Sequence, residues 1–520
     1  MKLYKFPLER SGAFSSIFLD YLRQDDKLTP FYGLFPELEN FKSQIEKKKH
    51  FESKKRIFLR EAINTQYSGI EKSSKFIENL KGLAHNDTFT ITTGHQLNIF
   101  TGPLYFIYKI ITVINLCKKL KSAYPEYNFV PVYWMASEDH DVEEINHFHL
   151  FNKEYKWLTD QTGPVGRFNL HGIEKILEEL PEKASLFERA YLHHKNLSDA
   201  TRFIVNELFG EEGLIAIDPD HPLLKKEMKK VFYEEIHHHH AHKAVEETNL
   251  RLEKLGYPKQ VYSREINIFY IENYLRERIV KENNTYQVLN TKKTFNSQEI
   301  TELIELHPEK FSPNVILRPL YQEMVLPNLA YIGGPAEVAY WLQLKGVFDC
   351  YEVPFPIILP RNFALYVNRV NAKKLNKINI DPADLFLDWV QLKEKYLADN
   401  GLQQHQLTEE IDQIKRIFSS ISEKAEGIDK SLKGFIGAEQ TKIEKIILGI
   451  EKKIKKSEEN THDVVVRQLE SLKEKLFPGG QLQERTINFL NFYFNNPDLI
   501  PSLLQKFDPL DFSMNVLIEE

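Results

Sequence analysis

Polar and titratable side chains gather directly after two apolar runs of this 520-residue sequence. One set follows TFTITT and comprises Gly94, His95, Gln96, Asn98, Thr101 and Gly102. The other follows NFVPVYWMA and comprises Glu138, Asp139, His140, Asp141, Glu144 and Asn146. A neutral histidine accepts a proton near pH 7, and a nearby carboxylate orients it and stabilises its charged form. We therefore predict that His95 or His140 acts as a general base with Asp139 or Asp141, and that the other side chains bind substrate.

The same residues allow other interpretations. Asp141 or Thr101 could serve only as a helix cap. The Glu138–Asp141 cluster could instead hold zinc or manganese, which would make the protein a metal-dependent hydrolase. A separate histidine run, 237–242, lacks the glutamate of a His-Glu-x-x-His zinc motif, so we predict a solvated helix face there. Our preferred interpretation assigns no metal to the chain.

A third group of polar residues lies in and before NLAYIGGPAEVAYW, residues 328–341. Gly333 and Gly334 precede a predicted helix whose first turn contains Glu337. Such a junction presents backbone N–H groups to an anion, although Glu337 could equally complement the helix dipole. Arg318 and Arg361 lie beside apolar runs, where each could bind a carboxylate of a ligand or pair with a core acid. We predict that Gly333, Gly334, Glu337 and Arg318 bind substrate.

These residues need a scaffold that brings the ends of several strands together. Residues 88–94 and 128–136 are predicted strands that flank a helix opened by Gly102 and Pro103, which makes one β-α-β unit. Further strands are expected at 213–218, 315–327 and 355–360, with a partly helical insertion at 147–212. The expected fold class is therefore α/β with a doubly wound parallel sheet, in which ligands bind outside the carboxyl ends of the strands. Neither a P-loop nor a Gly-x-Gly-x-x-Gly fingerprint is present.

The C-terminal part of the chain has a different pattern. Apolar residues recur with alternating spacings of four and three from Leu407 to Leu432, and the pattern resumes at 443–454 and 465–476. This heptad spacing predicts an α-helical coiled coil. The polar stretch KKSEENTHD, 455–463, is where one helix could fold back on another within the chain; pairing with a second chain would leave the same pattern.

The changes of pattern along the chain suggest four parts. They are an N-terminal helical cover (1–85), an α/β core (86–390), a coiled-coil domain (391–490) and a C-terminal segment that docks on the core (491–520).

Composition restricts the class of protein further. A net charge of -6 without a basic arm argues against nucleic acid, and no apolar run approaches the roughly 20 residues that span a membrane. Two cysteines exclude a disulfide framework. We expect a cytoplasmic protein that binds small molecules. A coiled-coil scaffold without a ligand remains an alternative, although the acids and histidines after the apolar runs argue against it.

Four segments, in the same order over almost the whole chain, resemble the BshC family, described as the cysteine ligase of bacillithiol synthesis. They are TTGHQLNIFTGPLYFIYKI, VPVYWMASEDHDVEEINH, LAYIGGPAEVAYWLQLK and FPGGQLQER. The resemblance implies a Rossmann-like core with helical insertions, a C-terminal coiled-coil domain and a homodimer. It also implies a ligase that joins cysteine to the amine of glucosaminyl malate in the last step of bacillithiol biosynthesis. ATP with magnesium is the expected activator, because a free carboxylate is a poor electrophile.

Overall fold

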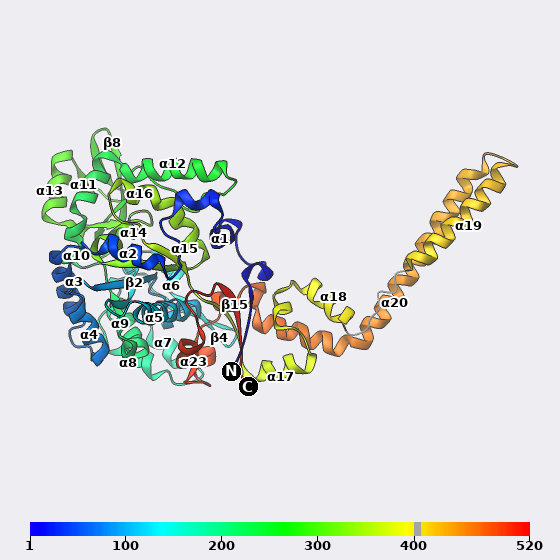
Figure 1. Ribbon diagram of the computed structural model, residues 1–520, viewed down its shortest axis with the longest axis horizontal. Coiled ribbons are helices and arrows are strands. Elements are labelled where there is room, and N and C mark those ends of the chain that lie inside the picture. Colours follow the sequence, from blue (N-terminus) through cyan, green and yellow to red (C-terminus); the bar gives the residue numbers. More distant parts are fainter. Residues whose placement is uncertain (400–406) are drawn as a thin grey trace. The chain divides into compact units, whose positions relative to one another are not determined.

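The computed structural model describes residues 1–399 and 407–520, with the side chains of 458–462 left out of the description. These residues form two compact units, whose helices and strands are labelled in Figure 1. The larger unit comprises Lys5–Leu365 and Leu482–Asn515. The smaller comprises Met1–Tyr4, Tyr366–Gln481 and Val516–Glu520. Residues 400–406 of the expected coiled-coil range lie outside the described residues.

The larger unit is built on a five-stranded sheet in which every neighbouring pair is parallel. In spatial order its strands are β13 (Ile357–Pro360), β12 (Asn328–Gly333), β2 (Thr88–His95), β3 (Asn128–Met135) and β6 (Ile215–Ile217). The first of these strands in the chain is central, so the strand order reverses between β2 and β12. This is the doubly wound order, and its switch point is where such sheets bind ligands. The predicted α/β class and four of the five predicted strands are confirmed.

The fifth predicted strand, 315–327, is wrong. Residues Arg318–Val325 form helix α14, and the strand of this region is β12, which begins at Asn328. Pro319 occupies the first turn of α14, where its missing N–H costs nothing. Because α14 is buried on nearly all sides, its apolar pattern resembles that of a buried strand.

Helices cover the parallel sheet, as Figure 1 shows. Helix α5 (Tyr105–Ala123) connects β2 to β3 and packs against both, and α2 (Asn40–Lys48) packs against β12. β2 is buried along its whole length, as expected of a central strand with covered faces. The remaining helices around this sheet are α1 (Ser16–Leu22), α3 (Ser53–Gln66), α4 (Ser74–Gly82), α9 (Leu197–Phe209), α15 (Pro335–Trp341), α21 (Gln483–Thr486), α22 (Leu490–Tyr493) and α23 (Leu499–Lys506).

A second, antiparallel sheet of five strands belongs to the same unit. Its spatial order is β10 (Thr294–Phe295), β9 (Thr285–Val288), β8 (Leu275–Glu282), β7 (Ile268–Glu272) and β11 (Phe311–Pro313). The expected insertion after β3 contains a hairpin as well as helices. The helices of this insertion and of the region that contains the antiparallel sheet are α6 (Val142–Ile145), α7 (Glu174–Glu179), α8 (Ser185–His193), α10 (Pro222–Lys225), α11 (Lys229–His238), α12 (His240–Lys254), α13 (Ser297–Leu306) and α16 (Lys345–Cys350). The hairpin is formed by β4 (His147–Leu150) and β5 (Lys153–Lys156). A further sheet joins β1 (Lys2–Pro7), β15 (Ser513–Ile518) and β14 (Phe363–Val367).

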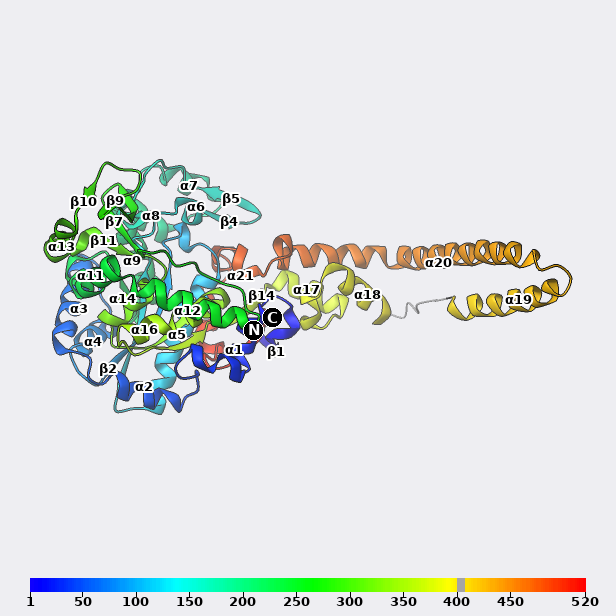
Figure 2. The ribbon, with the colours of Figure 1, turned by 90° about the horizontal axis from the view of Figure 1, so that it is seen from above.

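The smaller unit contains α17 (Arg369–Ile378), α18 (Trp389–Asp399), α19 (Thr408–Glu426) and α20 (Leu432–Leu476). α19 packs along α20 as an antiparallel hairpin within the chain, which Figure 2 shows, and the coiled-coil prediction is confirmed. The chain reverses at 427–431 rather than at 455–463, through which α20 is continuous. The polar stretch has no Gly or Pro, and Lys and Glu favour a helix.

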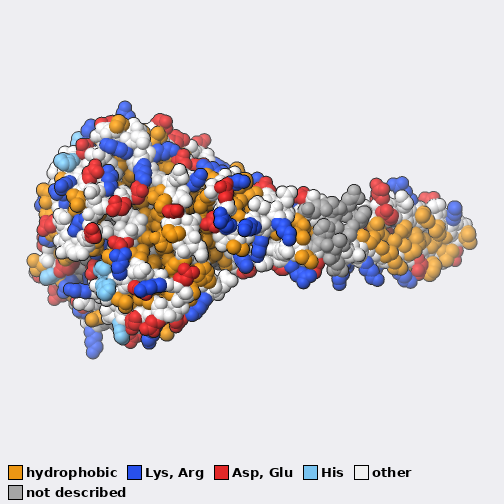
Figure 3. Space-filling model, turned by 90° about the horizontal axis from the view of Figure 1, so that it is seen from below, with side chains coloured by type: hydrophobic (Ala, Val, Ile, Leu, Met, Phe, Trp, Pro, Cys, Tyr) orange, Lys and Arg blue, Asp and Glu red, His pale blue; other side chains and the backbone are white. Residues whose placement is uncertain are grey.

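The α19–α20 hairpin leaves many apolar side chains in contact with solvent, and Figure 3 shows them gathered at its distal end. Ile417 is 57% exposed, Ile428 85% and Phe435 63%. None of the helices in the described ranges is both long and apolar enough to cross a membrane.

Candidate functional site

A cavity of about 820 Å³ opens where the carboxyl ends of β2, β3 and β12 meet the antiparallel sheet. All of its lining residues belong to the larger unit. Its position is the switch point of the doubly wound sheet, so the fold alone would place a ligand here.

Positive side chains outnumber negative ones in the lining of this cavity. The acids are Glu138, Asp139, Glu144 and Glu337. The cations are Lys109, Arg264, Arg276, Arg278, Arg318, Arg361 and Arg485. A cavity with walls of low dielectric strengthens the field of such a surplus, so it favours ligands with several negative charges.

At the switch-point end, Lys109 of α5 joins β2 to α15, the helix that follows β12. Its Nζ donates to the carbonyl oxygen of Gly94 at 2.9 Å and pairs with Glu337. Glu337 also accepts the backbone N–H of Gly334 at 2.8 Å and the hydroxyl of Tyr331 at 2.6 Å. Burial acts to raise the pKa of Glu337, but Lys109 and the hydrogen bonds from Tyr331 and Gly334 together outweigh burial, and the pKa is lowered. The predicted N–H group of Gly334 is therefore already used by the helix-capping carboxylate, and Pro335 has none to offer.

Two arginines at this end keep buried N–H groups without a hydrogen-bond acceptor among the described residues. They are Nη2 of Arg318 and Nε of Arg361. Nη1 of Arg318 donates to Gln322 at 3.2 Å, and no carboxylate in the described chain lies within ion-pair distance of this guanidinium. Buried polar groups are almost always paired, so unpaired N–H groups that line a cavity indicate where a ligand's acceptors lie. Gly94 allows this arrangement, because a Cβ there would lie 3.0 Å from the Tyr331 hydroxyl and 3.4 Å from Arg318.

His95, the last residue of β2, lies at the same end. Its ring packs between Tyr105 and Phe106, and its buried Nε2 has no hydrogen-bond partner among the described residues. Burial, followed by the charges of Lys109 and Arg361, holds the pKa of His95 well below its usual value. The imidazole is therefore neutral at pH 7 and faces the ligand as an uncharged donor or acceptor.

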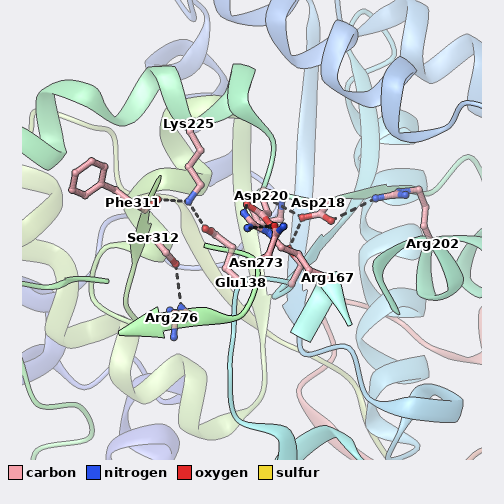
Figure 4. Close-up of polar contacts among 12 residues, drawn as sticks. Glu138, Arg167, Arg202, Asp218, Asp220, Lys225, Asn273, Arg276, Phe311 and Ser312 are labelled. Carbon is pink, nitrogen blue, oxygen red and sulfur yellow. Dashed lines mark hydrogen bonds and ion pairs between the residues drawn. The ribbon is translucent and has the colours of Figure 1, made fainter. Parts of the chain in front are cut away.

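Beside the opposite end of the cavity, after β3, acids and bases pair with one another, and of these Glu138 lines the cavity (Figure 4). Glu138 pairs with the fully buried Lys225, and Asp220 receives two hydrogen bonds from Arg167 at 2.6 and 2.8 Å. Asp218 accepts from Ser137 and lies 3.8 Å from Arg202. Burial raises the pKa of Glu138 even though Lys225 opposes it. Most of the charge at this end is thus neutralised inside the protein.

His140 and Asp139 lie beside this network within ion-pair distance of each other, but their side chains are not hydrogen-bonded. The Nδ1 atom of His140 is 3.7 Å from Asp139 and 2.7 Å from Nη1 of Arg276, which must be the donor. Burial and Arg276 lower the pKa of His140. Asp139 instead accepts from Gln96 at 2.8 Å.

The metal alternative needs several acids and histidines to converge. Glu138 instead pairs with Lys225, His140 accepts a hydrogen bond from Arg276, and Asp139 accepts one from Gln96. Among the residues with described side chains, no group of three or more His, Cys, Asp or Glu is placed to hold a metal ion. The cluster that the hydrolase alternative requires is not formed, and that alternative is unsupported.

The loop after β2 contains a turn with unusual backbone geometry. Phe100, Thr101 and Gly102 have φ values of 51°, 70° and 62°, in the left-handed region. Asn488 holds this turn, because its Nδ2 donates to the carbonyl oxygens of Phe100 and Gly102, both at 2.7 Å. A Cβ at Gly102 would lie 2.6 Å from Asn98, so only glycine fits. Thr101 and Gly102 therefore shape the loop.

Two family models match this chain and together cover nearly all of it. Residues 1–362 match the N-terminal Rossmann-like domain of the bacillithiol biosynthesis protein BshC, and residues 364–519 match its C-terminal coiled-coil domain. The chain belongs to the BshC family. The predicted Rossmann-like core and coiled-coil domain are confirmed.

Curated members of the BshC family align over almost their full length. The relative from Flavobacterium johnsoniae is 45% identical, with 98% of each chain covered, and the one from Cytophaga hutchinsonii is 40% identical, with 99% of each covered. A relative from Bacillus cytotoxicus is 28% identical over 91% of this chain and 93% of its own. Each is named "Putative cysteine ligase BshC". These names confirm the prediction of an enzyme of the ligase class.

Nine of the sixteen predicted site residues line the cavity of this BshC-family chain, and seven do not. Those in the lining are Gly94, His95, Gln96, Glu138, Asp139, Glu144, Arg318, Gly334 and Glu337. Those outside it are Asn98, Thr101, Gly102, His140, Asp141, Asn146 and Gly333. Asn98 supports the lining from behind by donating to the backbone of Glu144 at 2.7 Å. Asp141 precedes α6 but makes no capping hydrogen bond with its side chain.

Several lining residues were not predicted as site residues. Lys109 is a lone cation on the buried side of an apolar helix, a signal that the sequence does contain. Arg276 and Arg278 alternate in β8. Arg485 follows Glu484 within FPGGQLQER, a segment that had served only to mark the family resemblance.

Proposed function

We propose that this chain joins the carboxylate of cysteine to the amine of glucosaminyl malate, forming an amide in the last step of bacillithiol biosynthesis. The observation that carries the proposal is the cation-rich cavity at the switch point, whose arginines keep unpaired N–H groups. The names of the relatives support the cysteine ligase part of it.

Glucosaminyl malate suits this cavity by charge. It carries two carboxylates and one ammonium group, so it needs cations at one end and a carboxylate or neutral acceptor for the amine. We propose that Arg318 binds one malate carboxylate, with Arg361 and Arg485 nearby, since a guanidinium donates two parallel hydrogen bonds to a carboxylate. Gln96, Asn98 and Glu144 would support the sugar side.

The amine must lose a proton before it attacks. His95 is neutral and its Nε2 is free, and Glu138 keeps one edge in the cavity while Lys225 holds the other oxygen. We propose that one of these two groups accepts the ammonium proton; the nitrogen lone pair then attacks the activated cysteine carbonyl, and the activating group leaves with the bonding pair.

Activation of the carboxylate is assigned to ATP with magnesium. ATP would convert the cysteine carboxylate either to an acyl phosphate with release of ADP or to an adenylate with release of pyrophosphate, and the amine then displaces phosphate or AMP, both of which carry negative charge. Arg276 and Arg278 of β8, with Arg264 from the segment before β7, line the cavity and would suit phosphate oxygens. Cysteine and ATP are both cytoplasmic metabolites, and we place the reaction there.

Homodimerisation is likewise a proposal. The exposed apolar side chains of the α19–α20 hairpin support it, because isolated helices seldom leave such a face in water. Sedimentation analysis at several protein concentrations checks this, and a single monomeric species at micromolar concentration would contradict it.

The activity is tested with purified protein, cysteine, glucosaminyl malate and magnesium ATP, each omitted in turn, with the product measured by mass spectrometry. Bacillithiol formed only in the complete mixture is the expected result. Product formed without ATP would show that ATP is not the activator. A protein that binds glucosaminyl malate but forms no product would contradict the proposed reaction.

A further inference from the structure

Arg361 is held in a fixed orientation by a residue more than a hundred positions later in the chain. Its Nη2 donates to Oε1 of Glu484 at 2.6 Å, and its Nη1 donates to the carbonyl oxygen of Asn362 at 3.0 Å. The guanidinium also lies over the rings of Tyr105 and Phe363, at 5.2 and 4.6 Å from their centroids. Of its three nitrogens, only Nε lacks a partner among the described residues.

Glu484 has no contact with the cavity. It is 1% exposed and does not line the cavity, and its second oxygen accepts the backbone N–H of Ala364 at 3.0 Å. Both carboxylate oxygens are therefore used to fix the loop that follows β13. A bound ligand would meet Arg361 but not Glu484.

The charges around Arg361 explain why this pairing is needed. Lys109 and Arg318 line the same end of the cavity, and the nearest acid there, Glu337, is already paired with Lys109. Without a counterion, mutual repulsion of three cations would favour turning Arg361 toward solvent. Glu484 supplies that counterion from outside the cavity.

We infer that Glu484 is a positioning residue of the BshC-family site, which acts through Arg361 to present a single N–H group, Nε, to an anionic part of the substrate. This inference rests on the proposed function for the identity of that substrate, the malate part of glucosaminyl malate. It gives the FPGGQLQER segment a role in the site that its position after the coiled coil does not suggest.

Three variants test the inference. Glu484→Gln keeps the size of the side chain and removes its charge, and Glu484→Asp keeps the charge but shortens the reach. Lys48→Met is the matched control: it breaks the Lys48–Glu323 pair, which is equally buried but lies outside the cavity lining. Each variant is measured by thermal unfolding, by calorimetric binding of glucosaminyl malate, and by crystallography for the orientation of Arg361.

Glu484→Gln is expected to weaken glucosaminyl malate binding by about tenfold or more, raise KM more than it lowers kcat, and leave Arg361 turned or disordered. Glu484→Asp is expected to show a smaller shift in the same direction, and it keeps the test open if the Gln variant fails to fold. Lys48→Met should lose stability without changing the dissociation constant by more than about twofold.

Two outcomes would overturn the inference and are distinct from failure of the proposed function. One is an unchanged Arg361 in the crystal structure of a Glu484 variant. The other is a loss of binding in Lys48→Met as large as in Glu484→Gln. If the wild-type protein binds no glucosaminyl malate, the proposed function fails, and the orientation of Arg361 still decides the role of Glu484.

Discussion

The same kinds of charged residue lie around the two ends of the cavity, but they are paired differently. At the β3 end, Glu138, Asp220 and Asp218 each have a basic or hydroxyl partner inside the protein. At the switch-point end, Arg318 donates to Gln322 and has no carboxylate within ion-pair distance among the described residues, and one nitrogen each of Arg318 and Arg361 lacks an acceptor there. A buried polar group that is already paired serves the fold, and one that is left unpaired is available to a ligand. Pairing, more than residue type, thus separates the structural end from the binding end.

The largest expected effect tests the structural end. Lys225→Met leaves the Glu138 carboxylate buried without its cation, so we expect the free energy of unfolding to fall by about 3–5 kcal/mol. Urea denaturation at pH 7 measures it. Arg318→Met is the contrast and should lower the free energy of unfolding by less, about 1.5–3 kcal/mol, because it removes a hydrogen bond to Gln322 but no ion pair among the described residues. Equal losses of unfolding free energy in the two variants would contradict the distinction between a structural end and a binding end.

Binding should respond in the opposite sense. Arg318→Met is expected to weaken glucosaminyl malate binding by about 2–4 kcal/mol, roughly 30- to 1,000-fold, because a charged hydrogen-bond donor to the carboxylate is removed. Titration calorimetry gives the dissociation constant. Arg23→Met, which alters an arginine that is 55% exposed, serves as the control and should bind normally. Wild-type affinity in the Arg318 variant would show that glucosaminyl malate does not bind at the switch-point end of the cavity.

The pH dependence of stability sharpens the comparison. Because the pKa of His95 is lowered by burial and by nearby cations, the unfolded chain takes up a proton before the folded protein does as pH falls. The contribution of His95 to the free energy of unfolding is therefore fully present above about pH 6.5. Below that pH it is lost by up to about 1.4 kcal/mol per pH unit. His95→Gln should flatten this part of the profile.

His140→Gln is the internal control for the pH experiment. Burial also lowers the pKa of His140, but its side chain is 45% exposed, so solvent screening should make its contribution smaller. Unfolding free energies at pH 7.0, 6.0 and 5.0 compare the variants with wild type. An identical slope in wild type and His95→Gln would show that His95 is not held neutral.

The smallest expected effect concerns turnover. His140→Ala should lower kcat by less than about tenfold, whereas a general base contributes about 100-fold or more. The reason is that Arg276 occupies Nδ1 of His140 and the ring does not line the cavity. Steady-state assays of His140→Ala and His95→Ala are compared. A loss above a hundredfold in His140→Ala alone would restore His140 as the base.

The fold was predictable from sequence where local pattern decides it. Strands β2 and β3, their connecting helix and the heptads follow from periodicity and turn residues. Helix α14 was not predicted, because it is short and buried on nearly all sides, so its apolar run resembles that of a buried strand. The reversal of the coiled coil at 427–431 was also missed, since a polar stretch suggests a loop even where its residues favour a helix.

The site was predictable only in part, and the reason is pairing at long range. The loops after β2 and β3 stood out because their residue types are unusual there. Which side chains would be neutralised depends on contacts such as Glu138–Lys225 and Arg361–Glu484, separated by 87 and 123 residues. No local pattern reveals that Arg276 rather than Asp139 would meet His140.

The segment that contains Glu484 and Asn488 has a consequence for biosynthesis. Both residues lie within the last tenth of the 520-residue chain, and they hold Arg361 and the left-handed Phe100–Gly102 turn. While the ribosome is still translating the coiled-coil region, the nascent polypeptide has its parallel strands but lacks these two tethers. The cavity therefore gains these two tethers only after residues 484–488 have been synthesised, much later than the strands whose ends form it.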